Sequence, residues 1–534
     1  HMTTPTDEPI GKVSPIRVAL LIYSVFFLCG PFTGMQGIFA AVAKRGVFAS
    51  KCDGSSDHNN VTISSSAPTS TVSPSTAFMC HDQEHAIAAV GNAAANLMNA
   101  VGIVSGFAVD VFGPHRTALV GGFFWIAGVA IGGIDPESGI PFTISMLVSS
   151  LGTAFLFLPM CVYYSRVATG GNNIKALSLL LAVFTGCWDM GTLVMWLIAT
   201  ILDNTSQSTF PLWAMFAVYS AFGIVAIVGF ATLFHEPPAA DEPIGDDEDV
   251  GAILYRQESR LDIQEEKLSC GAKVGAILGS YVDDIKSFLR KFEFWIVTAK
   301  AFGAVGIGYI FLDNIGPLVR FRDDGGGEHV PEMLRNVTLM MGLSALWSIV
   351  PGRLQQAFGP TKGSAITAIA SPFMLILTGL FFVTVDATPE GKAYQNNYTA
   401  FFFFLMWRVV GFAIISVCIN VVVCADGKGV GTAFGAVFSF AGAICTPVGQ
   451  YITNLLETAT EPPKDGATGL SQKNKDTVIA VVWTLVGIGI VFDIVLSWTL
   501  LRMHKRQVAA DAAGDSKKEV PTEESKLLLN SGPA

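Results

Sequence analysis

Long apolar stretches separated by short polar ones run along nearly the whole chain of 534 residues. A membrane-spanning helix needs about 20 predominantly apolar residues, so we read each stretch as one span. The spans cover roughly residues 16–43, 84–108, 115–134, 139–163, 175–201 and 211–234, and then 292–319, 332–351, 363–385, 398–424, 430–456 and 477–502. The pattern predicts an all-α membrane protein with twelve transmembrane helices in two six-helix bundles.

The polar regions divide the chain into parts. We expect a cytoplasmic N-terminus at 1–15, an N-terminal bundle at 16–234, a cytoplasmic linker at 235–291, a C-terminal bundle at 292–502 and a cytoplasmic tail at 503–534. The linker is acidic at first and becomes amphipathic from Ala272 to Phe292, where apolar residues recur near helical spacing. This pattern is typical of a helix at the membrane surface. It is equally typical of a solvated linker helix that packs on the bundle.

A short internal repeat supports the division into two halves. Residues Gly106–Arg116 read GFAVDVFGPHR, and 246 residues later Gly352–Lys362 read GRLQQAFGPTK. Each copy lies between two long apolar stretches, at corresponding places in the two halves. Duplicated membrane bundles of this kind build alternating-access transporters, with a central site between halves that rock against each other.

Composition and charge narrow the function classes. Hydrophobic residues make up 51 % of the chain and charged residues 14 %, with a mean hydropathy of +0.51. The net charge of -10 is concentrated outside the apolar runs, so it describes aqueous loops. The sequence has no basic stripe for nucleic acid, no phosphate-binding loop, no metal-ligand cluster and no nucleophile–base spacing. We therefore expect no enzyme activity, no cofactor, no metal and no nucleic-acid partner.

Charge placement predicts the orientation in the membrane. With both termini cytoplasmic, the inside loops carry most Lys and Arg residues, as the positive-inside rule requires. The expected inside cations are Arg116, Arg166, Lys175, Arg353, Lys362, Lys428 and the cluster at 502–506. Glycosylation motifs then fall outside, at Asn60, Asn204 and Asn397, with Asn336 near the start of a span. We expect the plasma membrane, although the acidic dileucine pattern Glu523–Leu528 also suits an endosomal or lysosomal membrane.

Two features concern processing. His1-Met2 resembles a cloning remnant, and the first apolar run is too long for a cleavable signal, so it should remain as a span. Cys52 and Cys80 share the first outer loop, where an oxidising compartment favours a disulfide. The other cysteines lie in spans or cytoplasmic segments and suit burial as small apolar side chains.

The repeated turn carries a resemblance to a known family. The segment Gly106–Arg116 resembles the signature loop of the major facilitator superfamily, G-x-x-x-D-x-x-G-R-(R/K). The resemblance implies a gate, in which the acid caps a neighbouring helix or pairs with a cation in one state. Val111 stands where the family usually has a basic residue, and Gln356 replaces the acid in the second copy, so the gate should be asymmetric. The implied gate residues are Gly106, Asp110, Gly113, Arg116, Gly352, Gln356, Gly359 and Lys362.

A finer resemblance concerns the branch of the superfamily. The segments Ala43–Cys52, Cys80–Gln83 and Gly106–Pro114 are similar to the facilitative large-neutral-amino-acid transporters and to the apicomplexan amino acid transporters. Asp426–Gly435 is similar in placement to that group's loop before the eleventh span. The resemblance implies an amino acid as the small-molecule substrate. We expect a monomer surrounded by membrane lipids.

Ionisable residues at membrane depth are costly and are functional hypotheses by default. Asp189 falls near the middle of the fifth expected span, Arg408 near the middle of the tenth and Asp313 in the outer third of the seventh. A zwitterion needs a cation for its carboxylate, and the forked donors of Arg408 suit that role. Asp189 or Asp313 would face an ammonium or guanidinium group. Alternatively, Arg408 and one acid form a buried pair that only holds spans together.

Other residues could complete such a site. Trp188 and Trp407 adjoin the charged residues and could wall a side-chain pocket. In the first span, Gly30, Thr33 and Gly34 could expose backbone groups to a polar ligand, while close helix packing through small residues is the alternative.

These observations leave several transport hypotheses open. Two membrane acids against one membrane arginine favour cationic amino acids such as arginine or lysine. The alternatives are a facilitator of large neutral amino acids, a proton-coupled carrier of another small polar solute in which Asp189 titrates, and a non-transporting nutrient receptor.

Overall fold

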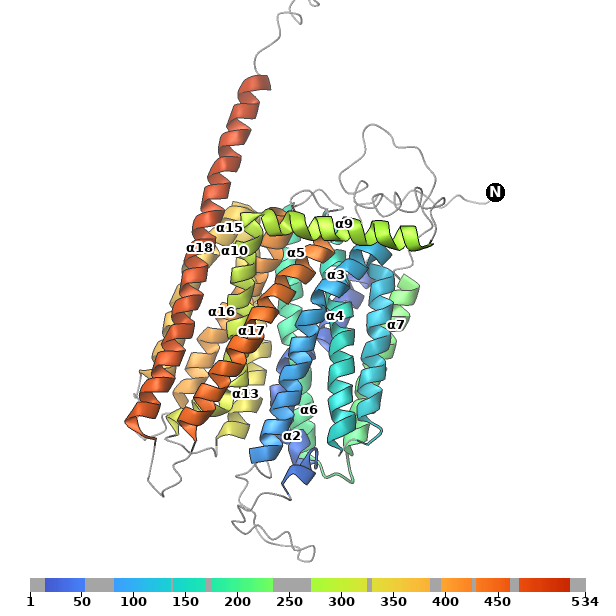
Figure 1. The fold of residues 1–534 in the computed structure, drawn as a ribbon, viewed down its shortest axis with the longest axis vertical. Coiled ribbons are helices and arrows are strands. Elements are labelled where there is room, and N and C mark those ends of the chain that lie inside the picture. The colour runs from blue at the N-terminus through green and yellow to red at the C-terminus, as the bar shows by residue number, and fades with distance from the viewer. Residues whose placement is uncertain are drawn as a thin grey trace, which may run out of the picture.

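The computed structural model describes residues 15–52, 81–135, 138–169, 174–233, 270–323, 329–384, 395–424, 429–461 and 470–518. Within these ranges the chain is helical and contains no strand. Figure 1 shows the long helices lying side by side, with one helix crossing them at one end. Of the described helices, ten are long and apolar enough to cross a membrane. The expected all-α membrane fold is confirmed.

The first six expected spans correspond to nine described elements. They are α1 (Pro15–Ser24), η1 (Val25–Cys29), η2 (Gly30–Gly34), α2 (Gln36–Lys44), α3 (His81–Gly132), α4 (Gly139–Thr169), α5 and α6 (Ile174–Met190 and Thr192–Asn204), and α7 (Leu212–Leu233). The first span is broken by a π-helical turn and a 3₁₀ turn around Pro31. Proline has no backbone N–H and cannot complete the regular helical ladder.

The second half is built in the same way. Its elements are α10 (Phe292–Ala301), η5 (Phe302–Ile307), α11 (Gly308–Asp313), α12 (Ile315–Arg322), α13 (Val330–Ser344), η6 (Ala345–Ser348), α14 (Ile349–Phe358), α15 (Pro360–Val383), α16 (Asn396–Cys418), η8 (Ile419–Val423), α17 (Val430–Thr460) and α18 (Gln472–Lys518). We call the part 15–233 the N-terminal half and the part 292–518 the C-terminal half.

The last helix differs from its expected length. We expected the final span to end near residue 502, but α18 continues to Lys518 and projects beyond the bundle in Figure 1. The segment just after 502 is rich in strong helix formers such as Ala, Lys, Arg and Gln and has no glycine before Gly514. The helix therefore does not stop where the apolar pattern stops.

The repeated turn has the same backbone geometry in both halves. Inside α3, Gly113 has φ 82° and ψ 155°, and it joins the second and third expected spans. Between α14 and α15, Gly359 has φ 85° and ψ 155°. This region is open essentially to glycine alone. The internal repeat of the sequence is thus a repeat of structure, which explains why both copies keep glycine followed by proline.

The amphipathic linker helix is present as α9 (Cys270–Arg290), and it packs on the bundle. Figure 1 shows α9 crossing the ends of the long helices. The hydroxyl of Tyr281 donates to the backbone oxygen of Ile103 in α3 at 2.8 Å. Just after α9, the ammonium group of Lys291 donates to the backbone oxygen of Val423 at 2.9 Å. The helix and its C-terminal flank therefore contact both halves.

Burial keeps the α9 contact insensitive to physiological pH. Burial, with a smaller contribution from the Asp110 carboxylate, raises the pKa of Tyr281 to about 12. The hydroxyl therefore stays protonated and able to donate. The first part of the linker, 235–269, and the dileucine pattern of the tail lie outside the described residues.

Candidate substrate site

A buried ion pair joins the two halves. Nη1 of Arg408 on α16 donates to Oδ1 of Asp189 on α5 at 2.6 Å. The two side chains are only 2 % and 1 % exposed. The structure therefore brings together two of the three charged residues that we singled out in the sequence, across the interface between the N-terminal and C-terminal halves.

The surroundings of the pair explain its position. Asp189 lies near the end of α5, one turn before the helix resumes as α6. The guanidinium carbon of Arg408 lies 4.9 Å from the ring centroid of Phe412, which favours the cation. Gly308 leaves room for the arginine, because a Cβ there would lie 3.3 Å from Cδ of Arg408. Oδ2 of Asp189 and Nε1 of Trp188 are buried with no hydrogen-bond partner among the described residues.

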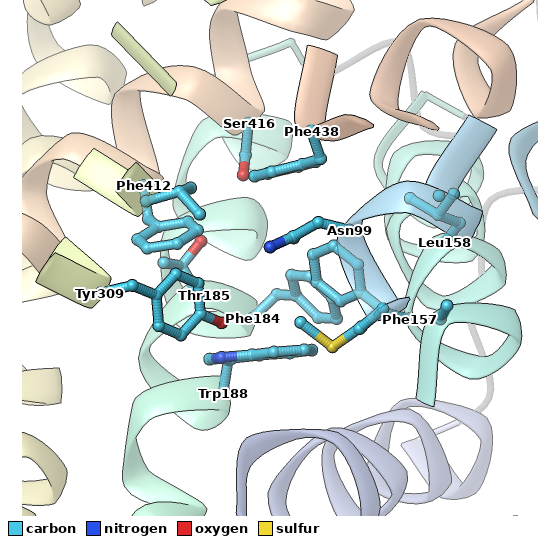
Figure 2. A pocket seen from close by; sticks show the side chains of 14 residues that line it. Asn99, Phe157, Leu158, Phe184, Thr185, Trp188, Tyr309, Phe412, Ser416 and Phe438 are labelled. Atoms are coloured by element: carbon cyan, nitrogen blue, oxygen red, sulfur yellow. The ribbon is translucent and has the colours of Figure 1, made fainter. Parts of the chain in front are cut away.

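A cavity lies beside the pair, between the halves. Figure 2 shows polar atoms of Asn99, Thr185 and Ser416 set among aromatic rings. The lining residues are Met98, Asn99, Gly102, Ala154, Phe157, Leu158, Phe184, Thr185, Trp188, Val305, Tyr309, Phe412, Ser416 and Phe438. The cavity volume is about 40 Å³, which is room for about three water molecules. In this conformation the cavity is too small for an amino acid.

The third charged residue makes a separate contact between the halves. With its amide oriented to satisfy both groups, Asn92 on α3 donates to the carboxylate oxygens of Asp313 on α11, at 3.2 and 3.1 Å. Asp313 is not among the residues that line the cavity. The structure does not join Asp313 to Arg408 and Asp189.

The halves are closed together at the end of the bundle near α9. Asp110 accepts hydrogen bonds from the backbone N–H groups of Gly431, at 3.1 Å, and Thr432, at 2.7 Å. These groups belong to the first turn of α17, so the acid caps a helix of the other half. Gly106 permits the close approach, since a Cβ there would lie 2.3 Å from the backbone oxygen of Gly431.

The second copy of the turn has no equivalent cap. Oε1 of Gln356 accepts from Arg353 of the same helix at 3.1 Å. Gly352 packs on α5, where a Cβ would lie 2.7 Å from Cβ of Ala182. Arg116 and Lys362 are exposed, and the Lys362 ammonium lies 5.7 Å from the ring centroid of Phe358. The two copies therefore have the same backbone conformation but differ in their polar contacts.

The halves also touch on the other side of the cavity. The hydroxyl of Thr192 on α6 donates to the backbone oxygen of Thr338 on α13 at 3.1 Å. Gly37 packs against the same residue, and a Cβ there would lie 2.4 Å from the hydroxyl oxygen of Thr338. The halves therefore contact each other on both sides of the cavity.

Several expected site residues lie elsewhere. Trp407 points away from the cavity, and its Nε1 donates to Oδ2 of Asp493 at 2.8 Å. Gly30 and Gly34 pack closely on the fifth span, where a Cβ would lie 2.1 Å from the backbone oxygen of Trp188 and 2.7 Å from Cβ of Thr192. The side chain of Thr33 lies outside the described residues. Of the expected aromatic and glycine residues, only Trp188 lines the cavity.

The sequence analysis missed a second buried ion pair. The ammonium group of Lys300 on α10 contacts Oδ1 of Asp493 on α18, and both side chains are fully buried. The hydroxyl of Ser371 donates to Oδ2 of Asp493 at 2.5 Å. The Lys300 ammonium also lies 4.7 Å from the centroid of the Trp407 ring. Both charges stand inside apolar stretches, so the rule that singled out Arg408 would have found them.

The expected modification sites are only partly described. Asn60 and Cys80 lie outside the described residues. Cys52 is disulfide-bonded, and its pairing with Cys80 stays a prediction. Asn204 is exposed. Asn397 is fully buried, with both side-chain polar atoms unpaired among the described residues, so a glycan there would have to disrupt this packing.

Comparisons with known proteins agree with this architecture. The sequence matches the profile of the Major Facilitator Superfamily over residues 60–449, and no curated protein sequence matches it significantly. The proton:xylose symporter XylE bound to 6-bromo-6-deoxy-D-glucose has a similar structure, with a TM-score of 0.57 and 12 % identity over 91 % of this chain and 95 % of that one.

Two further solved structures are similar. The human organic anion transporter MFSD10 (TETRAN) gives a TM-score of 0.56 at 12 % identity, covering 91 % of this chain and 100 % of its own. The E. coli fucose:proton symporter FucP gives 0.52 at 12 % identity, covering 90 % and 98 %. At these identities the likeness shows the fold alone.

Proposed function

The chain belongs to the Major Facilitator Superfamily, whose profile matches residues 60–449, and we propose that it is an amino acid transporter that works by alternating access. Its halves rock about a central site, as in other transporters built from duplicated bundles. The residues that we assign to the site all belong to one chain, and we propose a monomer in the plasma membrane.

One observation carries the proposal. Arg408 and Asp189 come from different halves, meet at 2.6 Å, and lie beside a cavity that their neighbours Phe412 and Trp188 line. A zwitterionic amino acid carries one carboxylate and one ammonium group. Arg408 matches the carboxylate through its forked donors, and Asp189 matches the ammonium group. A sugar carries neither charge and would make no ionic contact with either residue.

The residues that line the cavity favour one kind of substrate side chain over another. The sequence favoured a cationic amino acid because two membrane acids stood against one arginine. In the structure Asp189 faces Arg408 and Asp313 faces Asn92. Among the described residues, no acid lines the cavity. The walls are mainly aromatic. These features support the alternative, a large neutral amino acid, whose side chain needs no second acid.

Uptake by purified protein in proteoliposomes tests the proposal. Radiolabelled leucine and arginine should be compared with and without an inside-negative potential imposed by potassium and valinomycin. If the substrate is neutral and no ion is transported with it, leucine uptake should not depend on the membrane potential. Arginine uptake driven by the potential would instead support a cationic amino acid as the substrate, since a potential of 100 mV acting on one charge contributes about 2.3 kcal/mol.

The same experiment addresses the remaining alternatives. Uptake that requires an inward proton gradient would support a proton-coupled carrier. Substrate binding without any flux would support a nutrient receptor. Transport of xylose but of no amino acid would contradict the proposal.

A further inference from the structure

We propose that Asn99 selects the substrate by its side chain, favouring neutral amino acids whose side chain ends in a hydroxyl or amide group over hydrocarbon side chains of similar size. This inference rests on the proposed function and deepens it, because it names the class of side chain that the same site takes. Tyrosine and phenylalanine, which differ by one hydroxyl group, are the pair of amino acids that tests it.

The first observation is an amide that faces the cavity without a partner. Asn99 on α3 lines the cavity, and its side chain lies among the aromatic rings in Figure 2. The residue is only 8 % exposed, and its side chain makes no hydrogen bond to another of the described residues. Buried polar side chains nearly always have a hydrogen-bond partner, so this amide is suited to a group of the ligand.

A second polar group in the same wall also lacks a partner. Nε1 of Trp188 on α5 is buried with no hydrogen-bond partner among the described residues, and its ring packs edge-on against Phe157, with the centroids 4.4 Å apart. The hydroxyl of Thr185, in contrast, donates to the backbone oxygen of Leu181 at 2.9 Å. An amide offers a donor and an acceptor, and an indole N–H offers a donor only. Asn99 and Trp188 together suit a hydroxyl or amide group, which both donates and accepts.

The surroundings indicate what kind of side chain carries that group. Arg408 and Asp189 would hold the two charges that every amino acid carries, so Asn99 remains for the side chain. The neighbouring walls are mainly aromatic (Figure 2), and among the described residues no charged side chain lines the cavity. A hydrocarbon side chain would cover the amide without a hydrogen bond. A site with such a buried polar group discriminates against a substrate that cannot pair with it.

The arrangement does not depend on how far apart the two halves are. Asn99, Phe157 and Trp188 lie on α3, α4 and α5 of the N-terminal half, and these helices pack on one another. The cavity must widen to admit an amino acid, and the halves of such transporters move largely as rigid bodies. The three residues therefore keep their relative positions when the cavity widens.

Competition measures the selectivity directly. Wild-type proteoliposomes take up radiolabelled leucine in the presence of unlabelled tyrosine or phenylalanine, and the concentrations that halve the uptake are compared. We expect the value for tyrosine to be about tenfold lower than that for phenylalanine, as one or two additional buried hydrogen bonds would give. Equal values, or a lower value for phenylalanine, would overturn the inference while leaving the proposed function intact. If no amino acid is taken up, the proposed function fails and this inference fails with it.

A variant assigns the selectivity to Asn99. Asn99→Leu removes the amide and keeps a side chain of similar size, so the values for tyrosine and phenylalanine should come within about twofold of each other, mainly because tyrosine binds more weakly. The control is Asn96→Leu, the same change one turn earlier on α3. The amide oxygen of Asn96 already accepts from Thr446 at 2.7 Å, and Asn96 does not line the cavity. The preference of this control for tyrosine should match the wild type.

Folding is checked by melting in detergent. Equal weakening of tyrosine and phenylalanine in Asn99→Leu, with normal melting, would show that Asn99 contacts the part common to all amino acids, and would overturn the inference. If Asn99→Leu melts early, Asn99→Ala removes the same amide without adding bulk, and the same loss of preference is expected. A preference for tyrosine that survives in the folded variant would overturn the assignment to Asn99.

Discussion

Trp407 and Arg408 are adjacent on α16, yet their side chains serve two different buried ion pairs. Nε1 of Trp407 donates to Asp493 within the C-terminal half at 2.8 Å, whereas Arg408 donates to Asp189 of the other half at 2.6 Å. Successive residues on a helix point about 100° apart. The helix α16 therefore connects a charge cluster within the C-terminal half to a charge that pairs with the N-terminal half.

The first prediction concerns Trp407 as a positioning residue. Trp407→Phe keeps the ring but removes the N–H donor, and a hydrogen bond to a charged group contributes about 1.5–3 kcal/mol. We expect the half-saturation concentration to rise several-fold, because the orientation of α16 that aims Arg408 is less well held. Uptake kinetics and detergent melting measure the two effects separately.

Trp483→Phe is the matched control. Trp483 packs against Gly379 on α15 and does not contact the ion pair in the described contacts. A rise in half-saturation concentration of the same size in both variants would show that Trp407 acts through general packing.

The second prediction concerns Lys300 and Asp493. Either single change, Lys300→Met or Asp493→Leu, leaves a fully buried charge without its partner, at a cost of about 3–5 kcal/mol. The double change removes both charges, so most of the lost stability should return. Melting of the four proteins in detergent forms a double-mutant cycle. Additive losses in the double variant would mean that the two charges do not stabilise each other.

The third prediction concerns Arg408 itself. Arg408→Lys keeps the positive charge but loses the forked donors. We expect the half-saturation concentration for leucine to rise about tenfold, which corresponds to about 1.4 kcal/mol. Melting should change little, because the ion pair with Asp189 can re-form. A variant that melts early but transports with unchanged affinity would leave Arg408 as a packing residue only.

The fourth prediction concerns Asp110. Asp110→Asn weakens the cap on the first turn of α17, and loss of a cap costs about 1 kcal/mol. The backbone amides of Gly431 and Thr432 should then exchange hydrogen about fivefold faster, since the halves open more often at this end. Hydrogen exchange read by mass spectrometry measures this directly. Gln356→Ala serves as the control, because Gln356 contacts only Arg353 among the described contacts, and it should leave exchange unchanged.

The fifth prediction concerns the outer loop. Pairing of Cys52 with Cys80 would close 28 residues and contribute roughly 3–4 kcal/mol on the chain-entropy account. Peptide mapping without reduction should find the two cysteines linked. A linkage of Cys52 to any other cysteine would refute this pairing.

The fold was predictable because the features that specify it are short patterns along the sequence. Apolar stretches of membrane length predict spans at any sequence position, and the glycine and proline of the repeated turn predict a sharp connection in both halves. The extension of α18 to Lys518 was not predictable from hydropathy, because helix propensity continues after the apolar pattern ends.

The sequence indicates which charged residues lie inside apolar helices, but not the direction in which their side chains point. Sequence position places Arg408, Asp189 and Trp407 near mid-membrane, yet the direction of each side chain depends on how its helix is rotated against its neighbours. That rotation places Trp407 on Asp493 and Arg408 on Asp189. The close packing of Gly30 on the backbone of Trp188 is likewise a property of two helices together.

The attachment of α9 to both halves has a mechanical consequence. Tyr281 holds one half through Ile103, and Lys291, just after α9, holds the other through Val423. When the halves separate at this end, the distance between Ile103 and Val423 must grow, while a helix of fixed length cannot stretch with it. Because Lys291 directly precedes Phe292 of α10, α9 is also joined covalently to the C-terminal half. Opening at this end therefore stretches the Tyr281 hydrogen bond first, and α9 would swing away with the C-terminal half like a latch.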